Sequence, residues 1–399
     1  MICDEMATLI KGDYEAAARQ KTVSRSSLDP ERRLSQRKDE LHTGRVAMDE
    51  PRPQIDWIPS GKPAWRGGWM NGYASGLASV LGFLGHEVDY DQVMGDLGVA
   101  FITQGEENST NRFDGAVDVG WWPLESLAII RLNFLEGTVG REIRDIKLPA
   151  SAHDATARDL YRKWFEPALC ASLERRAPAV VRVGSTEYIV TGCDDHAEYP
   201  LIGMCPNEEA GKERIYRIEE PLPPYVALTF GQAQPTLDRA AADREALRFA
   251  IMLHRDQVLG VNYDGRYALR RAEEYGGAWR TGLRSYAAWI ACLEDTEHPG
   301  QSFWHGNVVR HLRLNRESAI RYLTAMQRRQ ATTIADHLGA AIEIYRAIVE
   351  EVGRCDASKQ ALSGLGGRQA LVAHIREIMR LETRAVEQIE RAVAALDCV

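Results

Sequence analysis

The pattern of apolar positions changes twice along this 399-residue chain and divides it into three regions. Residues 1–55 are polar, carry both charge signs and show almost no aliphatic periodicity. Such a segment cannot bury enough apolar surface to offset the entropy that it loses on ordering. We expect residues 1–55 to be a disordered tail or an extension upstream of a start at Met48. A partner-binding arm is the alternative.

Residues 56–232 begin with helical patterns. Apolar residues recur at helical spacing in the stretch 71–88, which predicts a helix with one buried face: Ala74, Leu77, Ala78, Leu81 and Leu84. Asp89 is a candidate N-cap for a short helix through Leu97 that ends at Gly98. Pro123 is expected to open a helix near residues 124–135 that stops at Gly137. A further amphipathic segment covers residues 155–175.

After residue 175 the period changes to that of strands. Four short β-rich segments follow, separated by turn residues: 179–183, 187–192, 199–204 and 213–219. They predict an antiparallel sheet, so residues 56–232 are expected to form an α+β domain. The proline-rich run 221–225 is expected to be its exit linker.

Residues 236–399 have a helical pattern almost throughout. Thr236 is a candidate N-cap for a helix through Leu259, and further helices are expected at 279–293 and 316–329. Two apolar stripes follow, separated by Gly353 and the glycine-rich stretch 363–367: Ile334, Leu338, Ile342, Tyr345, Val349 and Val352; then Leu371, Ile375, Ile378, Val386, Ile389, Val393 and Leu396. The region is predicted to be an all-α helical bundle domain, separable near residues 221–235.

Composition restricts the possible partners. The chain has 45% hydrophobic and 27% charged residues, which is ordinary for a globular protein. Its net charge of −8 argues against a nucleic-acid surface. We expect no membrane partner, since no apolar run is long enough to span a bilayer. Seven cysteines without a CxxC pair suit a reducing cytoplasm. No phosphate loop or dinucleotide fingerprint occurs, so no cofactor is expected. The oligomeric state stays open.

The helix at 71–88 carries a resemblance. It follows a Trp/Gly-rich lead-in that includes Trp65 and Trp69, and it closes on Gly-His-Glu-Val. Together with the later strands it resembles the papain-like fold of bacteriocin-leader peptidases and the N-terminal domain of the butirosin-biosynthesis acyltransferase. In those families a cysteine opens the helix, a histidine opens a central strand, and an Asp or Asn before proline follows one strand later. The resemblance implies peptidase or acyl-transfer chemistry.

The residues of that triad are missing here. With Leu77 and Gly85 as anchors, the nucleophile position falls on Gly72, the histidine position on Thr186 or Glu187, and the Asp/Asn-Pro position on Cys205-Pro206. Arg66 stands about where the oxyanion-hole glutamine would lie. A glycine cannot attack a carbonyl, so the resemblance predicts a papain-like domain without catalysis, which binds a peptide, an acyl group or a small molecule.

An active enzyme would need relocated chemistry. Ser75 is the candidate for a displaced nucleophile, and His196, beside Asp194 and Asp195, could approach it from the sheet. His86 is about 16 Å away along the helix axis and cannot serve Ser75. Cys193, Asp194, Asp195 and His196 also raise the possibility of a metal, but paired zinc-ligand spacings are absent. We favour a buried thiol at Cys193 and a solvated turn after it.

Six residues are candidates for ligand binding. Asn71, Tyr73 and Tyr188 are expected around the papain-like cleft. Trp279, Tyr286 and Trp289 fall on one face of the helix predicted at 279–293, in a segment that resembles a G-L-x-x-Y-x-x-W pattern of uncharacterised bacterial proteins. Such a stripe is more often core than pocket. Trp304, His305 and His311 could add polar groups to a pocket there. The arginines of residues 310–329 are interpreted as the solvent-exposed face of a helix.

Overall fold

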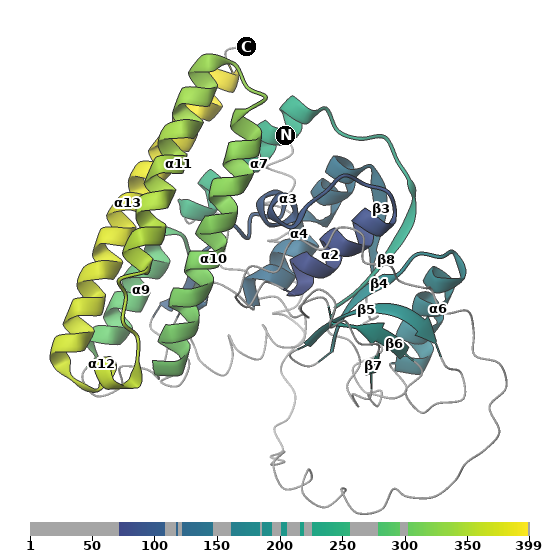
Figure 1. Ribbon diagram of the computed structural model, residues 1–399, viewed down its shortest axis with the longest axis horizontal. Coiled ribbons are helices and arrows are strands. Elements are labelled where there is room, and N and C mark those ends of the chain that lie inside the picture. Colours follow the sequence, from purple (N-terminus) through teal and green to yellow (C-terminus); the bar gives the residue numbers. More distant parts are fainter. Residues whose placement is uncertain are drawn as a thin grey trace, which may run out of the picture. The chain divides into compact units, whose positions relative to one another are not determined.

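The computed structural model describes an α/β region followed by a helical region (Figure 1). All described residues belong to one compact unit, which begins at Glu50. They are residues 72–107, 117–118, 122–146, 161–183, 186–193, 201–205, 216–218, 226–255, 278–295 and 302–397. The predicted tail at 1–55 lies outside them, as do Arg66, Asn71, Pro206 and the Asp194–His196 turn.

The α/β region contains an antiparallel sheet of six strands in the order β3-β8-β4-β5-β6-β7. The predicted antiparallel sheet is therefore confirmed, and two of its strands, β3 and β8, were not predicted. The strands are β3 (Arg141–Asp145), β4 (Ala179–Val183), β5 (Thr186–Cys193), β6 (Leu201–Met204), β7 (Tyr216–Arg217) and β8 (Val226–Ala233).

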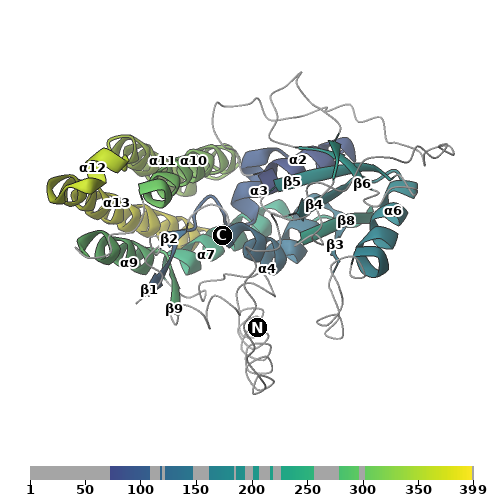
Figure 2. The same cartoon turned by 90° about the horizontal axis from the view of Figure 1, so that it is seen from below.

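Side chains alternate between the two faces of this sheet, as strand geometry requires. Val180 and Ile189 lie in the main apolar core. Their neighbours Val181 and Val190 lie in a second, smaller core. Helix α2 (Gly72–Phe83) covers the first face and helix α6 (Glu166–Glu174) the second (Figure 2). The sheet is thus enclosed between helices on both faces.

The helices before the sheet follow the predicted order. After α2 come α3 (Tyr90–Asp96), α4 (Trp122–Val139) and a π-helical turn η3 (Tyr161–Phe165) that leads into α6. The predicted cap of α3 is confirmed, because the side chain of Asp89 accepts a hydrogen bond of 2.7 Å from Gln92 N. Gly98 follows α3 with a φ of +80°, as the predicted stop requires.

Two predictions about this region are wrong. Helix α4 continues through Gly137, where the missing Cβ leaves room for the side chain of Leu237, and it ends before Gly140, whose φ is +65°. The predicted exit linker at 221–225 lies outside the described residues, but residues 226–233, within the predicted connector at 221–235, form strand β8. This strand lies between β3 and β4 and is hydrogen-bonded to both.

The helical region is confirmed, with shifted ends. Its elements are α7 (Arg239–His254), α9 (Leu283–Glu294), α10 (Ser302–Gln327), α11 (Thr332–Val352), α12 (Lys359–Ser363) and α13 (Leu365–Asp397). Helices α10, α11 and α13 lie side by side (Figures 1 and 2). Asp238 rather than Thr236 caps α7, since its side chain accepts a hydrogen bond from Ala241 N. The predicted break at residues 363–367 is confined to Gly364, because α12 ends at Ser363 and α13 begins at Leu365.

Trp279 does not lie on the predicted helix. It belongs to strand β9 (Ala278–Thr281), which pairs with β1 (Gln104–Glu107), and β1 in turn pairs with β2 (Val117–Asp118). The helix begins only after Gly282, whose φ is +57°. A Cβ atom at Gly282 would lie 2.3 Å from the carbonyl oxygen of His254, so glycine is required for both reasons.

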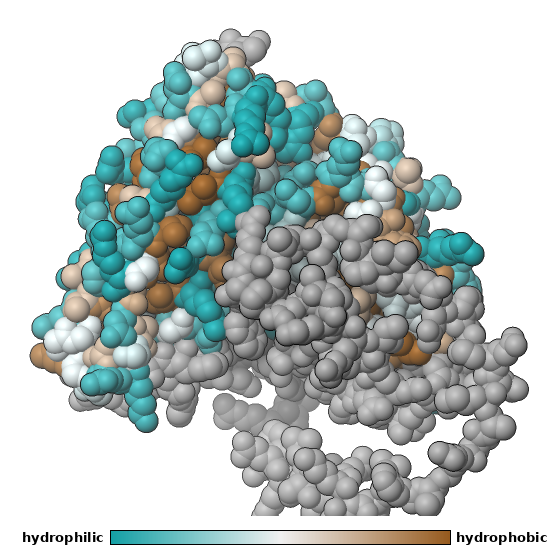
Figure 3. Space-filling view, in the orientation of Figure 1, coloured by the Kyte–Doolittle hydropathy of each residue, from teal (hydrophilic) through white to brown (hydrophobic). Residues whose placement is uncertain are grey.

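The α/β and helical regions share one apolar core. The main cluster includes Leu77 and Val180 from the first region and Leu338 and Ile375 from the second. The division into domains at 56–232 and 236–399 stays a prediction, and separating them would expose this common core. On the face drawn in Figure 3, polar side chains predominate over the described helices. No described helix combines the length and apolarity needed to cross a membrane.

Candidate functional site

Helix α2, on which the resemblance rests, lies directly against the sheet. A Cβ atom at Gly76 would be 3.2 Å from Cγ1 of Val180 and 3.8 Å from Cγ1 of Ile189. Val180 and Ile189 are cross-strand partners on β4 and β5. Gly76 therefore lets the helix backbone approach these two strands. The contact places α2 above the row of the sheet that contains Val180 and Ile189.

The contacts at the two ends of α2 give its direction. Beyond its C-terminus, Nε2 of His86 lies 3.1 Å from Nε of Arg141, at the start of β3. Near its N-terminus, burial raises the pKa of Tyr73, and the nearby carboxylate of Asp145, at the end of β3, raises it further. Asp145 and Val180 both pair with Leu228, so they share one row. The first turn of α2 therefore lies at the Asp145 end of the sheet.

Beyond this row, two charged residues occupy the α2 face of the sheet. Arg182 and Glu187 are cross-strand partners: Arg182 lies two residues after Val180 on β4, and Glu187 two residues before Ile189 on the antiparallel β5. Two strand residues span about 6.6 Å, close to the rise of one helical turn of about 5.4 Å. Gly72, one turn before Gly76, is thus placed toward the Arg182–Glu187 pair.

Burial controls the chemistry of this pair. Arg182 is 5% exposed, and its Nε lies 3.8 Å from Oε1 of Glu187. Burial raises the pKa of Glu187, and the positive charge of Arg182 partly opposes that rise. We define the α2 site as Gly72, Tyr73, Arg182 and Glu187. Gly72, Tyr73 and Arg182 are buried and Glu187 is partly exposed, so the site offers the Glu187 carboxylate beside the positive end of the α2 helix dipole.

The predicted catalytic residues fit this site poorly. Gly72 is the first residue of α2 and has no side chain to react. Ser75 is 2% exposed, so a substrate could reach it only if the structure opened. Cys205 follows β6 and is half-buried, whereas His196 lies outside the described residues. Thr186 and Glu187, the two residues that the resemblance aligns with the histidine, open β5.

Tyr73 and Tyr188 do not share a cleft. Tyr73 belongs to the main core on the α2 face of the sheet, and no described residue bonds its hydroxyl group. Tyr188 packs with the second core, on the α6 face. The prediction that both tyrosines face one ligand is wrong, because consecutive strand residues point to opposite faces and Ile189, not Tyr188, faces α2.

The aromatic residues of α9 lie inside the core. Tyr286 and Trp289 are both buried. The indole Nε1 of Trp289 donates a hydrogen bond of 3.0 Å to Nδ1 of His305 on α10. His311 is also buried, which lowers its pKa to about 4. These side chains are therefore packed as core residues, the interpretation that the spacing of the aromatic stripe favoured.

The sequence did not reveal a buried polar cluster that contains Tyr286. Its centre is Glu382 on α13, whose Oε1 accepts a hydrogen bond of 3.0 Å from the Tyr286 hydroxyl and one of 2.5 Å from Nε of Arg316. His254 approaches the other oxygen, with its Nε2 3.7 Å from Oε2 and 3.2 Å from the hydroxyl group of Tyr345. The Glu382 cluster consists of these five residues: His254, Tyr286, Arg316, Tyr345 and Glu382.

Every member of the Glu382 cluster is withdrawn from water. Burial would lower the pKa of Arg316, but the charge of Glu382 reverses this and raises it. Burial, and then the charge of Arg316, lowers the pKa of His254 well below its ordinary value. The cluster holds one ion pair and a neutral imidazole. Since its side chains are essentially inaccessible, it can position the helices around it but cannot receive a substrate.

The cluster left a signal in the sequence. Glu382 occupies an apolar position of the α13 stripe, four residues after Ile378 and four before Val386. Arg316 likewise stands between Leu312 and Ala319 on the buried face of α10. A charged residue in an apolar helical stripe needs a buried partner. Two such residues in one helical region therefore predict that they pair.

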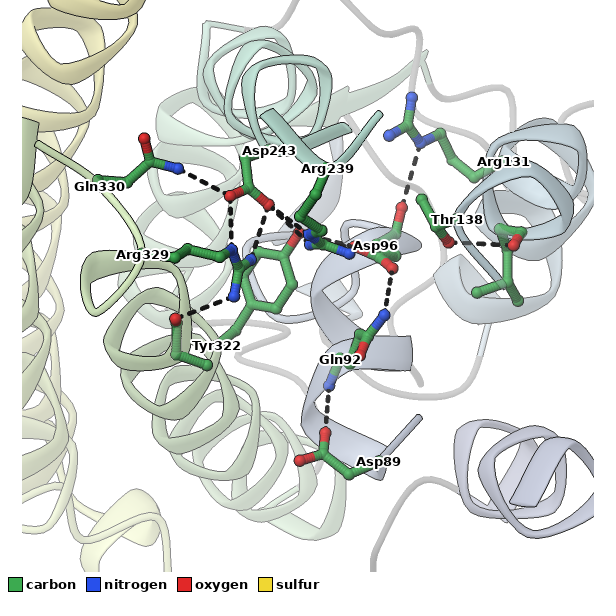
Figure 4. A network of polar contacts seen from close by, with 12 residues as sticks. Asp89, Gln92, Asp96, Arg131, Thr138, Arg239, Asp243, Tyr322, Arg329 and Gln330 are labelled. Carbon is green, nitrogen blue, oxygen red and sulfur yellow. Dashed lines mark hydrogen bonds and ion pairs between the residues drawn. The ribbon is translucent and has the colours of Figure 1, made fainter. Parts of the chain in front are cut away.

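A second network joins the two regions (Figure 4). Asp96 on α3 accepts a hydrogen bond of 2.7 Å from the hydroxyl of Tyr322 on α10. Asp243 on α7 accepts two bonds of 2.7 Å from Arg329, together with bonds from Arg239 and Gln330. Both carboxylates are fully buried and bonded on several sides. The network holds α3, α7 and α10 together.

Metal binding finds no support in the part of the chain that the structure describes, where no group of His, Cys, Asp or Glu side chains could hold an ion.

Of the residues predicted from the sequence, Gly72, Tyr73 and Glu187 are brought to one end of α2. Tyr286 and Trp289 do not belong to this group, because they are core residues of the helical region.

No known family model matches the chain, and no curated protein is detectably similar to it in sequence.

Proposed function

We propose that this chain is a non-catalytic binding protein of papain-like arrangement, whose ligand is held at the α2 site. One observation supports it: α2 packs through Gly76 on β4 and β5, and the positions that the resemblance gives to the nucleophile and the imidazole hold Gly72 and Thr186 or Glu187. Helices α2, α3 and α4 precede all six strands of the antiparallel sheet, and α6 lies between β3 and β4, which supports the same arrangement.

The chemistry of the site supports binding rather than turnover. Attack on a carbonyl by this kind of fold needs a thiolate that an adjacent imidazole stabilises. Glycine offers no nucleophile, and Glu187 is paired with Arg182. Ser75 is the displaced nucleophile of the alternative, an active peptidase or acyltransferase, and its burial counts against that role.

The groups at the site favour a ligand with an amide bond. The N-terminus of α2 carries partial positive charge and favours a carbonyl or carboxylate oxygen. Glu187 is half-buried and can accept a hydrogen bond from an N–H group. A short peptide presents both kinds of group within one unit. Among the ligands proposed here, a peptide therefore matches the α2 site better than a simple acyl chain.

The purified full chain should not hydrolyse p-nitrophenyl acetate or fluorescein-labelled casein faster than its Ser75→Ala variant does. Circular dichroism would establish that the variant is folded. The expected result is equal, background rates for both proteins. A reproducible activity that disappears in folded Ser75→Ala would show an active enzyme and refute the non-catalytic proposal.

Binding can be tested directly with a tripeptide library, by thermal shift and then by calorimetry. A tripeptide that binds the α2 site should lose about tenfold or more in affinity in Glu187→Ala, since a hydrogen bond to a charged group contributes about 1.5–3 kcal/mol. Glu174→Ala is the matched control, because Glu174 is exposed at the end of α6. Failure of every tripeptide to bind, or equal affinities for the wild type and Glu187→Ala, would contradict the proposal.

A further inference from the structure

Two cysteines meet on the face of the sheet opposite to α2. Cys170 lies on α6, and Cys193 is the last residue of β5. Both belong to the smaller core, where α6 packs on Val181 and Val190. The two residues are 23 positions apart in the sequence, and their sulfur atoms lie 2.7 Å from each other.

The contact brings two thiols nearly to the geometry of a covalent bond. Bonded sulfurs lie about 2.0 Å apart, so a small movement of two side chains is enough to join them. Cys170 is 6% exposed and Cys193 is 2% exposed. Leu169 and Leu173, on either side of Cys170, are buried in the same core and hold α6 in place. The thiols therefore face each other on two fixed elements.

We propose that Cys170 and Cys193 are a modification site, at which a small peroxide oxidant converts the two thiols into an intramolecular disulfide. The thiolate of one cysteine attacks hydrogen peroxide, its O–O bond breaks, and a sulfenic acid and water form. The second thiol then attacks the sulfenic sulfur, which forms the S–S bond and releases a second water molecule. The two cysteines lose two electrons and two hydrogens, and one peroxide becomes two waters.

Two other cysteines provide an internal comparison. Burial raises the pKa of Cys292, on α9, to about 11, and the pKa of Cys355 to about 12. Cys170 and Cys193 are more deeply buried than either, so what favours their oxidation is not exposure but the second sulfur at 2.7 Å, which can complete a disulfide. The sulfur of Cys355 donates to the carbonyl oxygen of Glu351. We expect these two cysteines to stay reduced under conditions that oxidise the pair.

The consequence is a covalent tie between α6 and the sheet. A disulfide restricts the unfolded chain and stabilises the folded one. The oxidised protein should therefore melt several degrees higher than the reduced protein, and dithiothreitol should reverse the change. This tie is independent of the α2 site, which lies on the other face of the sheet, so neither proposal depends on the other.

The test treats the purified full chain with hydrogen peroxide, blocks the remaining thiols with iodoacetamide and identifies peptides by mass spectrometry. The expected product is a cross-linked pair of peptides that contain Cys170 and Cys193, lighter by two hydrogens than the sum of the reduced peptides. Cys292 and Cys355 should be carbamidomethylated. In Cys193→Ser the cross-link and the rise in melting temperature should both be absent, and Cys193→Ala serves if the serine variant does not fold.

The result that would overturn the proposal can be seen in the wild type alone. If Cys170 and Cys193 remain alkylatable after denaturation, or are oxidised separately to sulfinic acids, they do not form the tie. A disulfide that joins either of them to Cys205 instead would equally refute the assignment.

Discussion

Glu382→Ala should lower the free energy of unfolding by about 3–5 kcal/mol, because it leaves a buried charge without its partner. Arg316 loses the acceptor of its 2.5 Å hydrogen bond, and the Tyr286 hydroxyl loses its own. Neither group can turn to water, since both are buried. Urea denaturation should show a lower midpoint with an unchanged slope.

Two variants make this result specific. Glu377→Ala removes a carboxylate from the surface of the same helix, and it should change stability by less than about 0.5 kcal/mol. The double variant Arg316→Met/Glu382→Leu replaces both charges of the buried pair by apolar side chains. It should recover much of the loss, since such pairs are often neutral when replaced together. A loss below about 1 kcal/mol in Glu382→Ala would show that the cluster does not hold these helices together.

Local signals predicted the local features of the fold. The cap at Asp89 and the stop at Gly98 were read correctly, because each depends on a few neighbouring residues. The stripes of α11 and α13 also gave helices in the right places. Long periodic segments and their caps can be predicted from neighbouring residues alone.

Features that depend on distant partners were missed. Strand β8 follows a proline-rich run that suggested a linker, but it is held between β3 and β4, with Phe230 opposite Ile143. Trp279 has helical spacing to Tyr286 and Trp289, yet its pairing with Glu106 makes it part of a strand. Pairing between strands that lie far apart in the sequence leaves no periodic signal near either partner.

The candidate site shows the same limit. From the resemblance, Gly72 was assigned to the nucleophile position and Thr186 or Glu187 to the histidine position. Arg182 could not, because its place beside Glu187 follows from the register of β4 and β5. The opposite directions of Tyr73 and Tyr188 also follow from that register. Strand pairing therefore decides which residues come into contact. The sequence alone gives the chemical type of each residue but not its partner.

Trp289→Ala should destabilise the protein by about 3–5 kcal/mol, the usual cost of removing a large buried aromatic side chain. Trp289 is 1% exposed and belongs to the main core that both regions share. The change creates a cavity and also removes the hydrogen bond from Nε1 to His305. Because this core is shared, the loss should appear in the melting of the whole described unit.

The control is Ala287→Ser, an exposed position on the same helix, which should stay within about 0.5 kcal/mol of the wild type. Trp289→Phe separates packing from hydrogen bonding, since it keeps an aromatic ring but not the indole N–H. It should lose less than Trp289→Ala does. A Trp289→Ala protein with near wild-type stability would show that the indole contributes little to the core. The aromatic face of α9 would then become a candidate ligand pocket, in competition with the α2 site.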